Sequence, residues 1–164
     1  MKTRDESLEK LAFYKRNIEN PLINIINTRA QDNNFERQWI QLHLSNRDLQ
    51  YAISQLSTLN LRVLQQLAEI EPATSAQLIS ALDLTIGVVT KHLNKLSRLG
   101  FVNRKHPDEK TELFQLTPAG SQVVETQNQL SVLLDQQHAR LVEKYTPEEL
   151  DTVAAFLKDL QQGH

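Results

Sequence analysis

The sequence contains no cysteine among its 164 residues. This absence excludes disulfide bonds, thiolate metal sites and thiol-based redox sensing. Methionine occurs only at position 1, so methionine oxidation is excluded as a switch as well. The chain has four glycines, which are too few to favour the glycine-rich loops that bind phosphates in many enzymes.

Long hydrophobic runs are also missing, since no apolar stretch approaches the roughly 18–20 residues that span a membrane. The first residues, MKTRDESLEKL, mix acidic and basic side chains and lack the apolar core of a signal peptide. We therefore expect a soluble, cytoplasmic protein without a membrane partner. A chain of this length forms one or two small domains with a real core.

The charges are segregated along the chain, although the formal net charge is only −2. Between positions 84 and 111 six basic residues accompany two acidic ones, whereas between 118 and 164 three basic residues accompany seven acidic ones. A basic patch on a mildly acidic protein indicates a localised anionic partner.

Most of the sequence has the periodicity of amphipathic helices. A first helix is predicted over about residues 5–19, with a break at Asn20-Pro21 and a short apolar helix after it. Apolar residues then repeat every 3.5 positions, which fits one long helix over about Asn34–Leu56. The tetrapeptide SNRD resembles a capping box, so two helices with a break at Ser45 remain an alternative.

Three helices with short connections are predicted next, beginning at the capping residues Ser57, Thr74 and Thr85. Gly100 suits the left-handed end of the third helix. Two strand-prone runs follow, FVNRK and TELFQLT, with the turn-forming HPDEK between them. This order of elements is that of a helix-turn-helix with a β-hairpin wing. Two Thr-Pro pairs, at 117–118 and 146–147, then open the last two helices.

The third of these helices, IGVVTKHLNKLSR, has an apolar side and a basic side. The apolar stripe, with His92 at its edge, consists of Ile86, Val89, Leu93 and Leu96. The opposite side, with Lys95 flanking it, consists of Gly87, Lys91, Asn94 and Arg98. Such a helix fits the major groove of DNA, where base edges present distinguishable donors and acceptors. A solvated basic surface is the alternative when the helix is taken alone.

The segment from Leu56 to Gly120 resembles the MarR-type regulators (multiple-antibiotic-resistance regulators). LSTLNLRVL, LTIGVVTKHLNKL and LTPAG stand where that family has its second helix, recognition helix and post-wing helix. The resemblance implies a mainly α fold with a small β-hairpin wing. A winged helix-turn-helix domain at 57–117 would lie between N-terminal extension and dimerisation helices at 1–56 and C-terminal dimerisation helices at 118–164.

The resemblance also implies a homodimer that binds a pseudo-palindromic operator in double-stranded DNA. It would regulate transcription, more often as a repressor than as an activator, and a small-molecule effector or another signal would release it. The N-terminal portion is longer than is usual in the family. We interpret about residues 5–29 as an extension that enlarges the dimer interface or shields a pocket.

Two motifs depart from the family pattern. The wing of the family carries Asp-x-Arg, in which the arginine enters the minor groove and the aspartate helps to hold the wing; this chain has Asp-Glu-Lys at 108–110. The usual Ser-x-Ser-Thr start of the recognition helix is Thr-Ile-Gly-Val here, which leaves a valine for apolar contact with a thymine methyl. The residues expected to bind DNA are Thr85, Gly87, Val88, Thr90, Lys91, Asn94, Lys95, Arg98, Lys105, Asp108 and Lys110.

An effector pocket has three candidate residues, Trp39, His43 and Arg47. The alternatives are a core or interface position for Trp39, an interface position for His43, and an ordinary surface position for Arg47. No metal site and no cofactor is expected, because the histidines are dispersed without His-x₃-His or Glu-x-x-His spacing. The segment Gln127–Ser131, where zinc-sensing relatives place histidines, has none.

Other classes of function find less support in the sequence. An enzyme would need a nucleophile with a base, a carboxylate pair in a pocket or a phosphate-binding glycine loop, and none of these patterns is present. We therefore expect no catalysis. The remaining alternative is a winged helix that acts as an adaptor, contacting another protein without recognising an operator.

Overall fold

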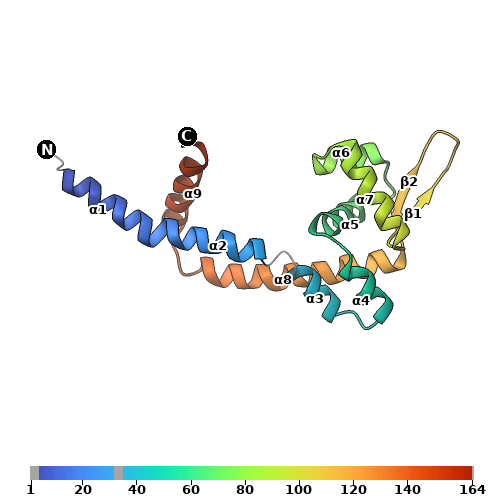
Figure 1. Cartoon of the computed structure of the whole chain (residues 1–164), viewed down its shortest axis with the longest axis horizontal. Coiled ribbons are helices and arrows are strands. Elements are labelled where there is room, and N and C mark those ends of the chain that lie inside the picture. Colours follow the sequence, from blue (N-terminus) through green and yellow to red (C-terminus); the bar gives the residue numbers. More distant parts are fainter. Residues whose placement is uncertain (1–3, 32–34, 164) are drawn as a thin grey trace.

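The computed structural model describes residues 4–31 and 35–163, and its overall shape is elongated (Figure 1). A helical cluster with a projecting hairpin forms one end, and the first and last helices form the other. The long helix α8 (Pro118–Val142) runs from the cluster into the other end. The buried hydrophobic core lies in the cluster, between residues 40 and 124. The expected fold class, mainly α with a β-hairpin wing, is confirmed.

The N-terminal helices are continuous rather than broken. Helix α1 (Arg4–Tyr14) passes through the π-helical turn η1 (Lys15–Glu19) into α2 (Asn20–Gln31). The predicted break at Asn20-Pro21 is wrong: Asn20 has helical angles and donates its backbone N–H to the carbonyl of Lys15. Proline lacks an N–H and crowds the preceding turn. The wider π-helical turn is a helix irregularity of the kind that accommodates a proline.

Two short helices, α3 (Phe35–Leu42) and α4 (Arg47–Ser54), replace the single long helix expected over Asn34–Leu56. Asn34 itself lies outside the described residues. The alternative of two helices is therefore correct, but the capping residue is Asn46 rather than Ser45. The Asn46 side chain accepts hydrogen bonds from the backbone N–H groups of Asp48 and Leu49.

The three helices of the helix-turn-helix begin where the sequence predicts. They are α5 (Thr58–Ile70), α6 (Ser75–Leu82) and α7 (Ile86–Arg98), each opened by the expected Ser or Thr cap. Gly100 has φ +85° and ends α7. Its N–H donates to the carbonyl of Ser97, and the N–H of Phe101 donates to Leu96, which is the Schellman pattern.

The wing consists of β1 (Val102–Lys105) and β2 (Leu113–Leu116), paired antiparallel as expected. A further bridge between Ala73 and Phe114 attaches β2 to the connection between α5 and α6. The base of the hairpin is therefore held by the core of the domain, while its tip projects away from the helices (Figure 1).

The last two helices, α8 and α9 (Pro147–Gln162), begin at the expected caps Thr117 and Thr146 with proline in the first turn. Helix α8 ends at Val142. Its first turn packs closely on the end of α7. A β-carbon on the buried Gly120 would collide with the carbonyl oxygen of Phe101.

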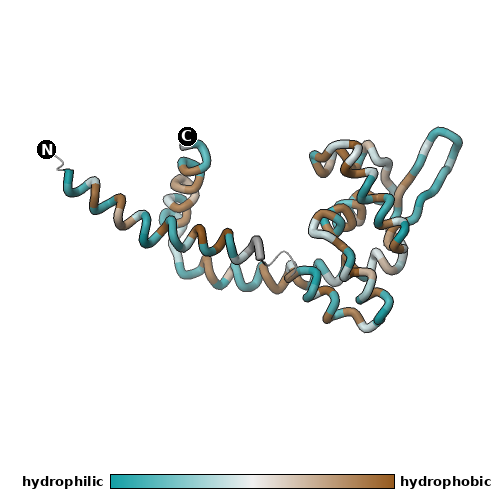
Figure 2. The backbone as a smooth tube through the Cα atoms, in the orientation of Figure 1, coloured by the Kyte–Doolittle hydropathy of each residue, from teal (hydrophilic) through white to brown (hydrophobic). Residues whose placement is uncertain are grey.

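Hydrophobic residues recur along the helices outside the core (Figure 2), and many of their side chains are exposed. Phe13 is 63% exposed and Val153 is 53% exposed. The rings of Tyr14 and Phe156 lie 6.0 Å apart, so α1 and α9 meet. No described helix is long and apolar enough to cross a membrane. The other large hydrophobic residues exposed on these helices are Leu8, Leu11, Ile23, Ile25, Ile26, Val132, Leu133, Leu141, Val142, Leu150 and Leu157.

Candidate nucleic-acid interface

Helix α7 buries one side in the core and leaves the other exposed. Val89, Leu93 and Leu96 are buried, as the apolar stripe predicts. Ile86 is 68% exposed, so its predicted place in the stripe is wrong. It is the first residue of the helix and precedes the part that packs into the core.

The basic side of α7 lines a groove of about 680 Å³. The groove brings together six of the residues expected to bind DNA: Gly87, Thr90, Lys91, Asn94, Lys95 and Arg98. Two further lining residues, Ser57 and His92, were not among those expected. Thr85 and Val88 do not line the groove, and the Thr85 hydroxyl accepts the Val88 N–H as the helix cap.

Lys95 makes a hydrogen bond within the protein. Its Nζ donates to the carbonyl oxygen of Gln55 at 2.6 Å, across 40 positions of sequence. Gln55 is the C-cap of α4, and a cation at a helix C-terminus is stabilised by the helix dipole. The contact joins the recognition-type helix α7 directly to the end of α4.

Asn94 is also engaged, in this case with the wing. Its Oδ1 accepts a hydrogen bond from the guanidinium of Arg104 on β1. Arg104 pairs with Glu112 at 3.3 Å and lies 5.5 Å from the ring centre of Phe114. The sequence places Arg104 only within the basic segment 84–111, because residue spacing does not show that a side chain of β1 reaches α7. The structure assigns it to fixing the wing against the helix.

The tip of the wing is organised by Asp108. Its carboxylate accepts hydrogen bonds from the backbone N–H groups of Lys110 and Thr111 and from the Thr111 hydroxyl. The bonds from the Lys110 N–H and the Thr111 side chain hold the pKa of Asp108 below its usual range. Asp108 thus orders the backbone of the turn over residues 108–111. Lys105 and Lys110 are exposed and lie outside the groove along α7.

His92 is linked to the buried start of α5. The Asn60 side chain is fully buried, and its Nδ2 lies 2.5 Å from Nδ1 of His92. Its Oδ1 accepts the backbone N–H of Ser57 at 2.9 Å. Burial lowers the pKa of His92, and the nearby cations Lys91 and Lys95 lower it further. The sequence placed His92 only at the edge of the apolar stripe and missed this contact.

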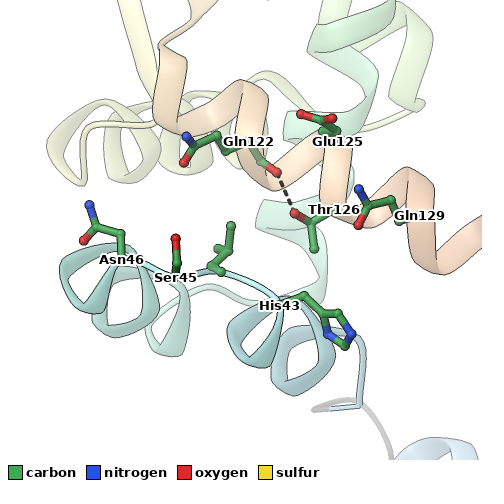
Figure 3. Close-up of a pocket in the computed structure, with 8 residues that line it drawn as sticks. His43, Ser45, Asn46, Gln122, Glu125, Thr126 and Gln129 are labelled. Carbon is green, nitrogen blue, oxygen red and sulfur yellow. Dashed lines mark hydrogen bonds between the residues drawn. The ribbon is translucent and has the colours of Figure 1, made fainter.

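A second cavity, of about 370 Å³, lies between the α3–α4 connection and α8 (Figure 3). We call it the polar cleft. Among the described residues that line it there is no lysine or arginine, and Glu125 is the one carboxylate. The residues lining the polar cleft are His43, Leu44, Ser45, Asn46, Gln122, Glu125, Thr126 and Gln129.

Of the three effector candidates, His43 lines the polar cleft, Trp39 contacts His43, and Arg47 lies on the surface. Trp39 and Arg47 do not line the cleft. The rings of Trp39 and His43 are stacked with centres 3.7 Å apart, and Nδ1 of His43 lies 2.8 Å from the carbonyl oxygen of Trp39. Trp39 is half-buried and packs against the core, in agreement with the alternative interpretation. Arg47 is exposed at the start of α4.

Comparison with known proteins agrees with this geometry. A family model described as a helix-turn-helix domain matches residues 57–105, which cover α5 to β1. No curated protein matches the sequence. Among solved structures, ZitR of Lactococcus lactis in complex with DNA has 21% identity and a TM-score of 0.65 over 90% of this chain and 98% of that one. FabT of Streptococcus pneumoniae in complex with DNA has 20% identity and a TM-score of 0.61, over 91% and 95% of the two chains.

The fold and the surface along α7 define a winged helix-turn-helix protein. More narrowly, the fold is that of the MarR-type regulators, as the sequence motifs predict. A structure of L. lactis ZitR described as a zinc-responsive MarR family member has 25% identity and a TM-score of 0.56, over 66% of this chain and 76% of that one.

A zinc site of the kind that this relative suggests does not fit the residues present. Within residues 4–31 and 35–163, no three His, Cys, Asp or Glu side chains are grouped so as to hold a metal ion. Gln127, in the segment where zinc-sensing relatives place histidines, is buried and donates its amide to the carbonyl of Leu61 and the carboxylate of Glu36. An amide in this position is a structural link between α8, α5 and α3.

Proposed function

We propose that the protein is a dimeric, sequence-specific DNA-binding regulator of transcription. The observation that carries this proposal is the form of α7: its apolar side is buried, and its opposite side brings Lys91 and Arg98 into one open groove. A β-hairpin projects beside it. A helix of this kind fits the major groove, and a wing reaches the flanking backbone. Two of the similar structures are complexes with DNA.

The expected residues then divide into three sets. Lys91 and Thr90 face the groove and would read base edges, while Arg98 would contact phosphate. Lys105 and Lys110 on the wing would contact the flanking backbone, with Asp108 shaping the turn. Thr85, Gly87 and Val88 form the start of α7, where a helix approaches bases most closely.

Asn94 has a more restricted role than the sequence suggests. Its Oδ1 already accepts from Arg104. A bidentate contact to adenine needs both the oxygen and the amide nitrogen. A bidentate contact would therefore require Oδ1 to accept from adenine with its second lone pair while Arg104 occupies the first.

A second copy of the chain would cover the exposed hydrophobic side chains of α1, α2, α8 and α9. Side chains such as Phe13 and Val153 are too numerous and too exposed for a monomer in water. In this arrangement residues 57–117 form the DNA-binding domain, and residues 1–56 and 118–164 provide the extension and the dimerisation helices. A pseudo-palindromic operator follows from the two-fold symmetry.

The polar cleft is the best place for an effector that releases a repressor from DNA. Asn46 lines the cleft and caps α4, and the other end of α4 holds Lys95 through the Gln55 carbonyl. A ligand that moves Asn46 would therefore move a side chain of α7. Because the described lining includes the carboxylate of Glu125 and no lysine or arginine, a neutral or cationic ligand with several hydrogen-bonding groups fits better than an anion.

Selection of bound duplexes from a random DNA pool, together with the native mass of the protein, tests the proposal. We expect a dimer and an enriched inverted repeat with half-sites about 10 bp apart. Lys91→Ala should weaken binding to the selected repeat about tenfold, whereas Lys144→Ala, an exposed lysine between α8 and α9, should not. A monomer without any enriched sequence, even at low salt, would instead indicate an adaptor.

A further inference from the structure

The capping box at the start of α5 fixes the orientation of the Asn60 side chain. The backbone N–H of Ser57 is only a donor, so the atom of Asn60 that faces it must be the carbonyl oxygen Oδ1. The N–H of Asn60 in turn donates to the Ser57 hydroxyl. With Oδ1 committed to Ser57, the amide nitrogen Nδ2 points to His92.

The orientation of Asn60 then fixes the protonation pattern of His92. Nδ2 of Asn60 carries hydrogens and no lone pair that accepts, so Nδ1 of His92 must be the acceptor. A neutral imidazole that accepts at Nδ1 carries its hydrogen on Nε2. A second proton on Nδ1 would place two donors against each other, and Lys91 and Lys95 also disfavour the cation.

We propose that His92 is a DNA-contacting residue that donates its Nε2–H to a phosphate oxygen of the backbone. The proposal rests on the proposed function and adds a residue to its DNA surface. His92 lines the same groove as Lys91, Lys95 and Arg98, and Nδ1 is held at the wall by Asn60. The ring therefore offers the groove one donor and no acceptor.

A phosphate is the partner that this donor fits. His92 lies at the edge of α7 that faces Ser57, at the start of α5. Lys91 and Arg98 are more exposed and lie on the outer side of α7. The cations Lys91 and Lys95 on either side attract an anionic oxygen to this edge. A neutral donor in a preset orientation contributes a hydrogen bond without ordering a long side chain.

The first test needs no DNA. Long-range ¹H–¹⁵N correlation of the histidine rings in the full-length protein at neutral pH should show His92 with its hydrogen on Nε2. In Asn60→Asp the carboxylate still accepts from Ser57 and now also accepts from His92, so the hydrogen should appear on Nδ1. A wild-type His92 with its hydrogen on Nδ1 would overturn the proposal, whatever the binding data show.

The second test compares substitutions at two residues of α7. Each variant is titrated with a mixed-sequence duplex of about 30 bp at several salt concentrations. His92→Phe keeps the ring and loses both nitrogens, and we expect about 5- to 10-fold weaker binding on every sequence. Its salt dependence should equal that of wild type, because a neutral donor releases no counterion. Arg98→Ala, which removes a cation proposed to contact phosphate, should instead make the salt slope shallower by about one.

The outcomes separate the two proposals. If Lys91→Ala weakens binding and a folded His92→Phe binds as tightly as wild type, the role of His92 is refuted and the proposed function stands. If His92→Phe changes the salt slope as much as Arg98→Ala does, His92 binds as a cation and the neutral-donor proposal fails. If the wild-type protein does not bind DNA at all, both proposals fail.

Discussion

Lys95 and Gln55 are joined by a hydrogen bond of 2.6 Å from the lysine ammonium to the backbone carbonyl. The bond connects the last turn of α7 to the C-cap of α4, and 40 positions of sequence separate the two residues. Lys95 therefore stabilises the packing of two helices in the free protein. Its charge is still close to the groove, but its position is set by α4 rather than by DNA.

Lys95→Ala is expected to lower the free energy of unfolding by about 0.5–1 kcal/mol, the usual value for a cation at a helix C-terminus. Lys91→Ala, one turn earlier, has no such contact and should leave stability unchanged within about 0.5 kcal/mol. Urea unfolding of both variants measures the difference. Equal stabilities for the two variants would mean that the Gln55 contact does not persist in solution.

At Gly87, a substitution should change the stability of the protein and its binding to DNA in opposite directions. A β-carbon there would meet no atom of the protein within 4 Å, so the fold does not require a glycine. Gly87→Ala should stabilise α7 by about 1 kcal/mol through helix propensity. If the backbone approaches DNA at this point, the same methyl group should weaken binding.

Thermal unfolding and DNA titration of Gly87→Ala measure the two effects separately. We expect a higher Tm together with weaker binding. A variant that is more stable and binds DNA as well as wild type would show that the start of α7 stays clear of the bases.

Gly120 gives the opposite result for the same substitution. Its missing side chain is required, because a β-carbon would collide with the carbonyl oxygen of Phe101, a backbone atom that cannot move alone. Gly120→Ala should destabilise the protein by about 3 kcal/mol, in the range of overpacked cores. Gly87→Ala is the matched control, and chemical unfolding of the pair should give shifts of opposite sign.

The sequence was sufficient to predict the elements whose signals are local. Ser57, Thr74 and Thr85 each cap a helix because a side-chain oxygen satisfies backbone N–H groups a few residues away. Gly100 ends α7 for an equally local reason, its positive φ. The groove residues on α7 followed from helical spacing, since the apolar stripe determines which side is exposed.

The features that were missed depend on contacts between distant segments or on a rare helix form. The predicted break at Pro21 did not allow for a π-helical turn. The partners of Asn94 and His92 are Arg104 and Asn60, and no spacing rule reveals such pairs. The exposure of Ile86 depends on where the neighbouring helices stop covering α7, which periodicity does not show.

The stability of the protein should fall as the pH is lowered through the range where histidine titrates. Burial, and then Lys91 and Lys95, lower the pKa of His92 from its ordinary value of 6.5. The unfolded chain therefore takes up a proton at a higher pH than the folded protein does. The stabilising contribution is complete above about pH 6.5 and is lost as the pH falls from there toward the lower pKa of the folded state.

Unfolding of wild type and His92→Gln between about pH 8 and 5 isolates this contribution, because the two proteins share every other titratable group. Glutamine still offers Asn60 an acceptor and does not titrate. Wild type should lose stability faster than the variant below pH 6.5, by at most about 1.4 kcal/mol per pH unit for one proton. Asp108 does not interfere, since its pKa is lowered from 3.8 and its contribution is lost only at more acidic pH. Parallel curves for the two proteins would mean that the environment of His92 does not disfavour its cation.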